Sequence, residues 1–132
     1  MKKIFILATF ILLAFATQAA KGYAEASFEK KEHDFGYINE TAGPVKCEFK
    51  FTNTGNKPLI IIEAVASCGC TSPEYPKRPI APGKSGVITV YYNPIGRPGG
   101  FKKDVKVRTN AGSGRTKTLT IIGSAIPAKE EK

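Results

Sequence analysis

Two cysteines separated by one glycine, Cys68-Gly69-Cys70, have the clearest capacity for chemistry in this sequence, and a third cysteine, Cys47, lies upstream. Thiols form disulfides, exchange them with other thiols or hold soft metal ions. Three cysteines in an oxidising compartment leave one of them unpaired in any monomer. The sequence is therefore compatible with four states of these residues.

The first two states are disulfides. A Cys68–Cys70 bond spans two residues of extended chain, about 6.6 Å, close to the upper limit of about 6.8 Å between the Cα atoms of a disulfide. Gly69 lets the chain bend, and such a bond is expected to be strained, easily reduced and suited to redox exchange. A bond from Cys47 to Cys68 or Cys70 would instead close a loop of about 20 residues and contribute roughly 3 kcal/mol.

The other two states are a metal site and a purely structural role. In the metal site Cys68 and Cys70 would hold Cu(I), or supply half of a zinc site. Zinc needs two further ligands, and His33 is the only histidine in the chain. In the plainest state Cys47 is a small buried hydrophobe, and the pair serves only the structure of its loop.

Other catalytic motifs are missing from the sequence. A hydrolytic triad needs a nucleophile beside a base, but the chain has one histidine and no Gly-x-Ser-x-Gly turn. Gly83-Lys84-Ser85 resembles the end of a phosphate-binding loop, yet Arg78 stands where that loop requires glycine. We therefore interpret this segment as a turn, and we expect a protein that is not an enzyme and has no catalytic residues.

The segments around the cysteines have the period of β-strands. In residues 45–51 the side chains of Val45, Cys47, Phe49 and Phe51 share one face, with charged residues between them. Turn residues separate these segments, and no helical period occurs after the first 20 residues. A first strand is expected at residues 27–31, ending near Phe35-Gly36, and further strands over residues 45–51, 59–62, 87–92, 101–109 and 118–122.

Two segments carry a further expectation about their place in a sheet. The continuous apolar run 59–62 predicts a central strand that is covered on both faces. Prolines 73, 76, 79 and 82 remove backbone donors, so the stretch after Cys70 is expected to be a loop or an edge crossing. Together the segments predict an all-β fold, an immunoglobulin-like antiparallel β-sandwich of about seven strands.

The first 20 residues have the order of a secretory signal peptide. Lys2 and Lys3 precede an apolar run from Ile4 to Ala16, and small residues follow up to Ala20. The run is shorter than the about 20 residues that span a bilayer. We expect a signal peptide at 1–20, one domain at 21–126, and a charged disordered tail at 127–132. The mature protein would be periplasmic or secreted, without stable membrane insertion.

The chain is basic, with a formal net charge of +9 at pH 7, of which Lys2 and Lys3 belong to the predicted signal peptide. Lys102, Lys106 and Arg108 share one face of their strand, with Asp104 between them, and Arg115 and Lys117 follow. These residues would bind an anionic glycan, or they would protect an edge strand from aggregation. No nucleic-acid partner is expected.

Six motifs stand in a characteristic order: Phe35-Gly36, Phe49-Lys50-Phe51-Thr52-Asn53-Thr54-Gly55, Pro58-Leu59, Ser67-Cys68-Gly69-Cys70-Thr71, Pro79-Ile80-Ala81-Pro82-Gly83 and Ile121-Ile122-Gly123. In this order they resemble a widespread bacterial family of exported proteins of unknown function. The domain of that family is similar to Hydin-type and major-sperm-protein-type immunoglobulin-like domains. The resemblance spans residues 28–126 and implies fold and export, but no activity.

The functional expectation is a non-enzymatic binding or scaffolding module of the bacterial cell envelope. Such a module would contact protein partners through a sheet face, an exposed edge or the proline-rich loop, and strand addition is the mode that the fold makes easiest. The first alternative is a thiol site at Cys68 and Cys70 for copper binding or disulfide exchange. Since Cys47 lies where the family resemblance has no cysteine, roles of the pair are favoured over roles of all three. The second alternative is binding of anionic glycans.

Overall fold

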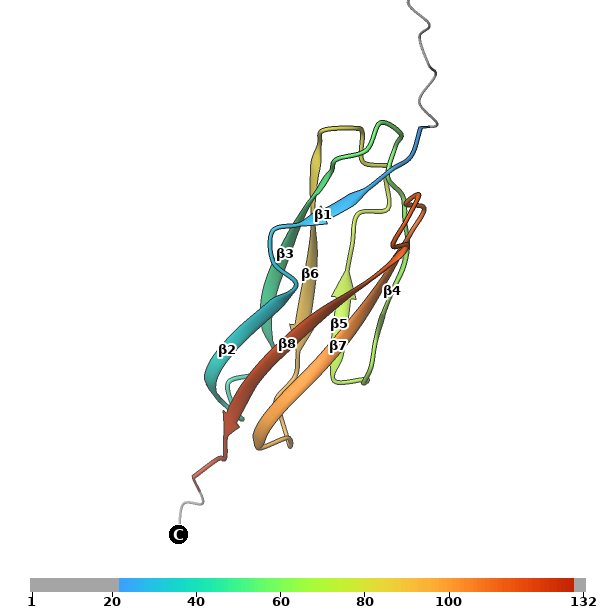
Figure 1. Ribbon diagram of the computed structural model, residues 1–132. Helices are drawn as coiled ribbons and strands as arrows, with labels where there is room; N and C mark the ends of the chain where they lie inside the picture. Colours follow the sequence, from blue (N-terminus) through green and yellow to red (C-terminus); the bar gives the residue numbers. More distant parts are fainter. Residues whose placement is uncertain (1–21, 130–132) are drawn as a thin grey trace, which may run out of the picture.

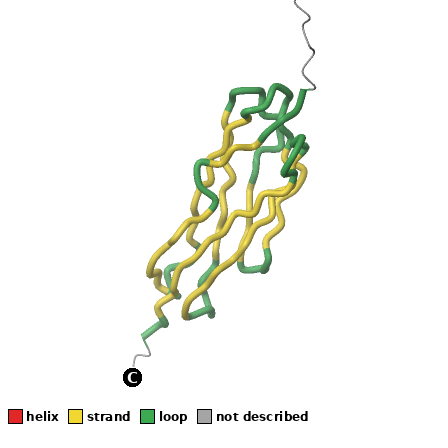
Figure 2. Tube along the Cα trace, viewed as in Figure 1, coloured by secondary structure: helices red, strands yellow, loops and turns green. Residues whose placement is uncertain are grey.

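Two four-stranded β-sheets packed face to face form the protein in the computed structural model, which describes residues 22–129 (Figure 1). The strands are β1 (Ala26–Phe28), β2 (Glu32–Asn39), β3 (Val45–Asn53), β4 (Ile61–Ala66), β5 (Thr71–Glu74), β6 (Ser85–Tyr92), β7 (Gly99–Thr109) and β8 (Thr116–Ile126). Loops join them, and residues 22–129 contain no helix that could cross a membrane (Figure 2). The predicted all-β immunoglobulin-like sandwich is confirmed, with eight strands where about seven were expected. The predicted signal peptide lies outside the described residues.

The strand order is β1-β3-β6-β5 in the first sheet and β2-β8-β7-β4 in the second. All neighbours are antiparallel except β2 and β8, which are parallel. The prediction of a single first strand from Ser27, ending near Phe35-Gly36, is wrong, because the chain changes sheets between β1 and β2. The exposed charged residues Glu29, Lys30 and Lys31 form this passage, where solvent can reach them.

The core lies between the two sheets and follows the predicted alternation. Cys47, Phe49 and Phe51 of β3 are buried, and so are Val105 and Val107 of β7. The charged residues between them face solvent. The inward faces predicted for these two strands are therefore confirmed, and apolar burial there supplies the main driving force for folding.

Asn53 is a buried polar residue that explains much of the Phe-x-Phe-x-Asn-x-Gly motif. Its Nδ2 donates to the carbonyl oxygens of Lys57 (2.7 Å) and Ile80 (2.9 Å), and its Oδ1 accepts from the backbone N–H groups of Glu25 (3.3 Å) and Gly55 (3.0 Å). A Cβ atom at Gly55 would collide with the carbonyl oxygen of Tyr23. The amide side chain thus ties three segments together beside a glycine that no larger residue can replace.

The apolar run 59–62 does not form the predicted central strand. Leu59 is buried and bridges to Ile80, and Ile61 begins β4, which is an edge strand of the second sheet. Ile60 and Ile62 are exposed, at 42% and 46% of their surface. A run of apolar residues therefore marks an uncovered edge here. By contrast, β5 with Pro73 lies at an edge of the first sheet, as the prolines predicted.

Candidate functional site

Each sheet has two edge strands, and all four carry features that discourage pairing with another chain; in β4 these are Glu63 and a register shift with β7 between Ile61 and Glu63. β1 has three residues, and β5 has four including Pro73. β2 carries Glu32 and Asp34, and its register with β8 shifts between Asp34 and Tyr37. β4 has six residues and neither a proline nor a lysine. We call the side of β4 that faces away from β7 the open edge.

Backbone hydrogen bonds show which residues of β4 face the open edge. The N–H of Ser67, directly after β4, donates to the carbonyl oxygen of Asp104 of β7 at 2.9 Å. Successive residues of an antiparallel strand direct their N–H and C=O groups to opposite sides. The register continues from Ser67 through Ala66, Val65 and Ala64. The N–H and C=O groups of Ala64 and Ala66 therefore point away from β7, and no strand of the described chain pairs with them.

Exposed apolar side chains accompany these backbone groups. Val65 is 53% exposed in the regular part of β4, and Ile62 is 46% exposed at the register shift between Ile61 and Glu63. A hollow of about 380 Å³ lies over β4 and its neighbour β7, lined by Val65, Ala66, Ser67, Asp104 and Lys106. The one charge on β4, Glu63, accepts a hydrogen bond from Arg108 at 2.9 Å. The strand thus presents backbone donors, backbone acceptors and apolar side chains together.

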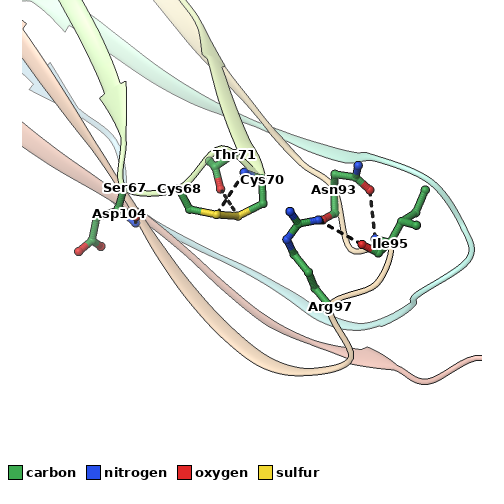
Figure 3. Close-up of a disulfide and its surroundings, with 8 residues drawn as sticks. All are labelled: Ser67, Cys68, Cys70, Thr71, Asn93, Ile95, Arg97 and Asp104. Atoms are coloured by element: carbon green, nitrogen blue, oxygen red, sulfur yellow. Dashed lines mark hydrogen bonds between the residues drawn. A yellow bond between two sulfur atoms is a disulfide. The ribbon is translucent and has the colours of Figure 1, made fainter.

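The chain leaves β4 through Ser67-Cys68-Gly69-Cys70 and crosses to β5 in the other sheet, and Figure 3 shows this crossover. Cys68 and Cys70 are joined by a disulfide, with their Cα atoms 5.3 Å apart. The backbone N–H of Cys70 donates to Sγ of Cys68 at 3.1 Å, and the hydroxyl of Thr71 lies 3.6 Å from Sγ of Cys70. Cys70 is buried, whereas Cys68 is partly exposed and Gly69 is exposed.

Backbone hydrogen bonds fix both ends of the crossover. On one side, Ser67 is bonded to Asp104 of β7, whose own N–H donates to the Ser67 hydroxyl at 3.2 Å. On the other side, the N–H of Asn93 donates to the carbonyl oxygen of Cys70 at 2.9 Å. The side chain of Arg97 lies in the same end of the sandwich (Figure 3) and bonds the carbonyl oxygen of Ile95 at 3.1 Å.

Cys47 is not part of the disulfide. It lies on β3 opposite Val90 of β6, and its side chain faces the core. Burial raises the pKa of the Cys47 thiol from its usual 9.0 to about 11. At neutral pH this residue is therefore a protonated, shielded thiol.

His33 is not brought to the cysteine pair. It lies on β2, while Cys68 follows β4 at the opposite edge of the same sheet, with β8 and β7 between them. The imidazole packs edge-on against Phe35 and lies 3.1 Å from Nζ of Lys30. Burial, with the charge of Lys30 second, lowers the pKa of His33. No three His, Cys, Asp or Glu side chains within residues 22–129 are grouped to hold a metal ion.

Lys102, Lys106 and Arg108 lie on β7, which has β8 on one side and β4 on the other. The hypothesis that these charges protect an edge strand is therefore wrong, because β7 is central. Lys117 of β8 forms an ion pair with Glu25 at 3.9 Å, and Arg115 is exposed in the hairpin before β8. Binding of an anionic glycan by these residues stays a prediction.

A second hollow, of about 550 Å³, lies where β2, β7 and β8 meet, and no sequence pattern indicated it. Gly36, Gly100 and Gly123 adjoin it, together with Tyr37, whose side chain is 81% exposed. The three glycines are far apart in the sequence. Only the register of the three strands brings them together, so no local signal could have revealed the hollow.

Comparison with known proteins places this arrangement in a family. A family model described as protein of unknown function (DUF1573) matches residues 26–125, nearly all of the described sandwich. A search of curated proteins finds no match.

Solved structures share the fold at low sequence identity. A protein of unknown function from Porphyromonas gingivalis W83 matches with a TM-score of 0.64 and 15% identity, over 78% of this chain and 46% of that protein, so the chain spans less than half its length. The PapD-like domain 7 of human CEP192 matches with a TM-score of 0.63 and 8% identity, over 81% of this chain and 89% of that domain. The periplasmic chaperone SfaE matches with a TM-score of 0.56 and 10% identity, over 76% of this chain and 58% of the chaperone. These likenesses show that the fold is PapD-like and immunoglobulin-like.

Proposed function

The chain belongs to the DUF1573 family of proteins of unknown function, and we propose that it is a non-enzymatic module that binds an extended segment of a protein partner. The partner segment adds as a strand to the open edge of β4. One observation carries the proposal: β4 is an edge strand without proline or lysine, its register shift lies at its start, between Ile61 and Glu63, and it exposes Ile62 and Val65.

Strand addition uses the groups that β4 presents. The N–H and C=O groups of Ala64 and Ala66 would pair with the backbone of the partner, which supplies affinity without regard to sequence. Specificity would come from apolar partner residues against Ile62 and Val65. A partner segment of alternating apolar and polar residues fits this edge.

The proposed setting is the bacterial cell envelope, in the periplasm or outside the cell. The charged and apolar segments at 1–20 support export, and a disulfide such as Cys68–Cys70 persists in oxidising compartments. The likeness to a periplasmic chaperone and to a PapD-like domain supports a protein-binding role. The Hydin-type and major-sperm-protein-type character of the domain belongs to the same proposal.

The test is photocrosslinking in the native host. The photoreactive residue p-benzoylphenylalanine replaces Ile62 at the open edge or, as a matched control, Val87, which is exposed on β6 in the other sheet. We expect a discrete protein adduct from position 62 and none from position 87. The adduct should be lost when Ala64→Pro removes an outward N–H, or when Val65→Lys adds an edge charge.

Thermal unfolding of each variant shows whether it is folded, and Val87→Lys controls for the added charge. Equal adducts from positions 62 and 87 would contradict the proposal, as would an adduct at 62 that survives in folded Ala64→Pro and Val65→Lys.

A further inference from the structure

We propose that Cys68–Cys70 is an exchangeable disulfide that oxidises dithiols of other proteins, entered at Sγ of Cys68. This activity goes beyond strand addition and does not rest on it. The geometry of the crossover carries the inference in three respects: how the backbone is held, how small the disulfide ring is, and how differently the two sulfurs are exposed.

The backbone on both sides is held without the disulfide. Ser67 is bonded to Asp104 through its N–H and its hydroxyl, and the Cys70 carbonyl oxygen is bonded to the N–H of Asn93. Thr71 continues into β5, where it pairs with Tyr92. Reduction of the S–S bond therefore leaves each cysteine anchored to a different sheet, close to its partner and ready to form the bond again.

The disulfide closes a ring of only three residues. Stabilisation by a disulfide grows with the logarithm of the loop that it closes, so this one contributes little to the stability of the fold. A structural bridge between the sheets would join residues distant in the sequence. This pair is instead positioned for chemistry at the surface of a fold that does not depend on it.

The two sulfurs differ in access and in hydrogen bonding. Cys68 and Gly69 are accessible, whereas Cys70 is 5% exposed. An incoming thiolate therefore meets Sγ of Cys68 first. The Cys70 N–H at 3.1 Å stabilises negative charge on that sulfur, and the Thr71 hydroxyl can donate to Sγ of Cys70.

The exchange has two balanced steps. One thiolate of the partner dithiol attacks Sγ of Cys68, which forms a mixed disulfide, breaks the S–S bond and releases Cys70 as a thiolate that takes up a proton. The second partner thiolate then attacks the partner sulfur of the mixed disulfide, and Cys68 leaves as a thiolate and is protonated. The partner dithiol loses two electrons and two protons, and the Cys68–Cys70 disulfide gains them.

The experiment uses the full mature protein with Cys47→Ala, which removes the third thiol. Under native conditions we expect dithiothreitol to reduce the disulfide, and the Cys68 thiol to become open to alkylation with β-sheet circular dichroism unchanged. Reduced thioredoxin lacking its resolving cysteine serves as the protein probe. It should attack the oxidised protein and form a mixed disulfide at Cys68, located by peptide mapping.

The single variants test the direction of attack. Each variant keeps one thiol of the pair, which is first converted to a mixed disulfide by a small aromatic disulfide. The thioredoxin probe should then exchange with Cys70→Ser at least about tenfold faster than with Cys68→Ser, because only Cys68 is accessible. A disulfide that resists dithiothreitol until denaturant is added would overturn the proposal. Mixed disulfides that form mainly at Cys70, or equal rates in the two variants, would overturn it as well.

Discussion

The backbone N–H of Ser67 donates to the carbonyl oxygen of Asp104 at 2.9 Å, and this bond relates the two candidate sites to each other. It fixes the phase of β4, so that Ala64 and Ala66 face the open edge. It also anchors the segment that enters the Cys68–Cys70 crossover. Strand edge and disulfide are therefore neighbours along the chain, positioned by the same contact with β7.

Amide hydrogen exchange of the free protein tests which residues of β4 direct their N–H groups to the open edge. We expect the N–H groups of Ala64 and Ala66 to exchange rapidly and the N–H of Val65 to be protected, because only Val65 faces β7. NMR measurement at single-residue resolution decides this. Uniform protection along β4 would mean that its outer side is already paired.

Asn53→Ala should destabilise the fold by about 3 kcal/mol, since it leaves four partly buried backbone groups without their partner. Urea unfolding measures the change. Asn56→Ala is the matched control, because Asn56 is exposed and accepts one bond, from the N–H of Tyr23 at 2.8 Å. A loss for Asn53→Ala no larger than for Asn56→Ala would refute the role assigned to the buried amide.

Replacing both Cys68 and Cys70 by serine should lower the free energy of unfolding by only about 1.5 kcal/mol, the loss expected for a three-residue ring. Circular dichroism should remain that of the native sandwich. A loss of more than about 3 kcal/mol would indicate a structural disulfide and would weaken the redox inference.

The buried thiol of Cys47 predicts a pH dependence of stability. Its pKa is raised to about 11 in the folded state, so between pH 9 and 11 the unfolded chain loses the proton while the folded protein keeps it. The stabilisation is complete below pH 9 and declines above it, by about 1 kcal/mol per pH unit. Urea unfolding at pH 8 to 10.5 should show this slope in the wild type, beyond that of Cys47→Ala. Identical slopes would contradict it.

Local patterns predicted the elements well and their neighbours poorly. Alternation in β3 and β7 identified the inward faces, since the period of side chains along a strand is a local property. Strand order is set by long-range pairing, and both errors about sheet position arose there: β4 was expected to be central and is an edge, while β7 was treated as an edge and is central.

The two candidate sites also differ in how far local patterns in the sequence predicted them. The Cys68-Gly69-Cys70 spacing pointed to a thiol site, because both residues lie within one short segment. The open edge was foreseen only as a mode of binding and was not assigned to a strand. Its exposed residues, Ile62 and Val65, belong to a segment whose composition is typical of a buried strand.

Strand addition is tested most directly by hydrogen exchange of the protein in complex with the partner found by crosslinking. We expect the N–H groups of Ala64 and Ala66 to become at least about tenfold more protected on binding, while the N–H of Val87 on the other sheet is unchanged. Tight binding that leaves Ala64 and Ala66 as exchangeable as in the free protein would contradict strand addition.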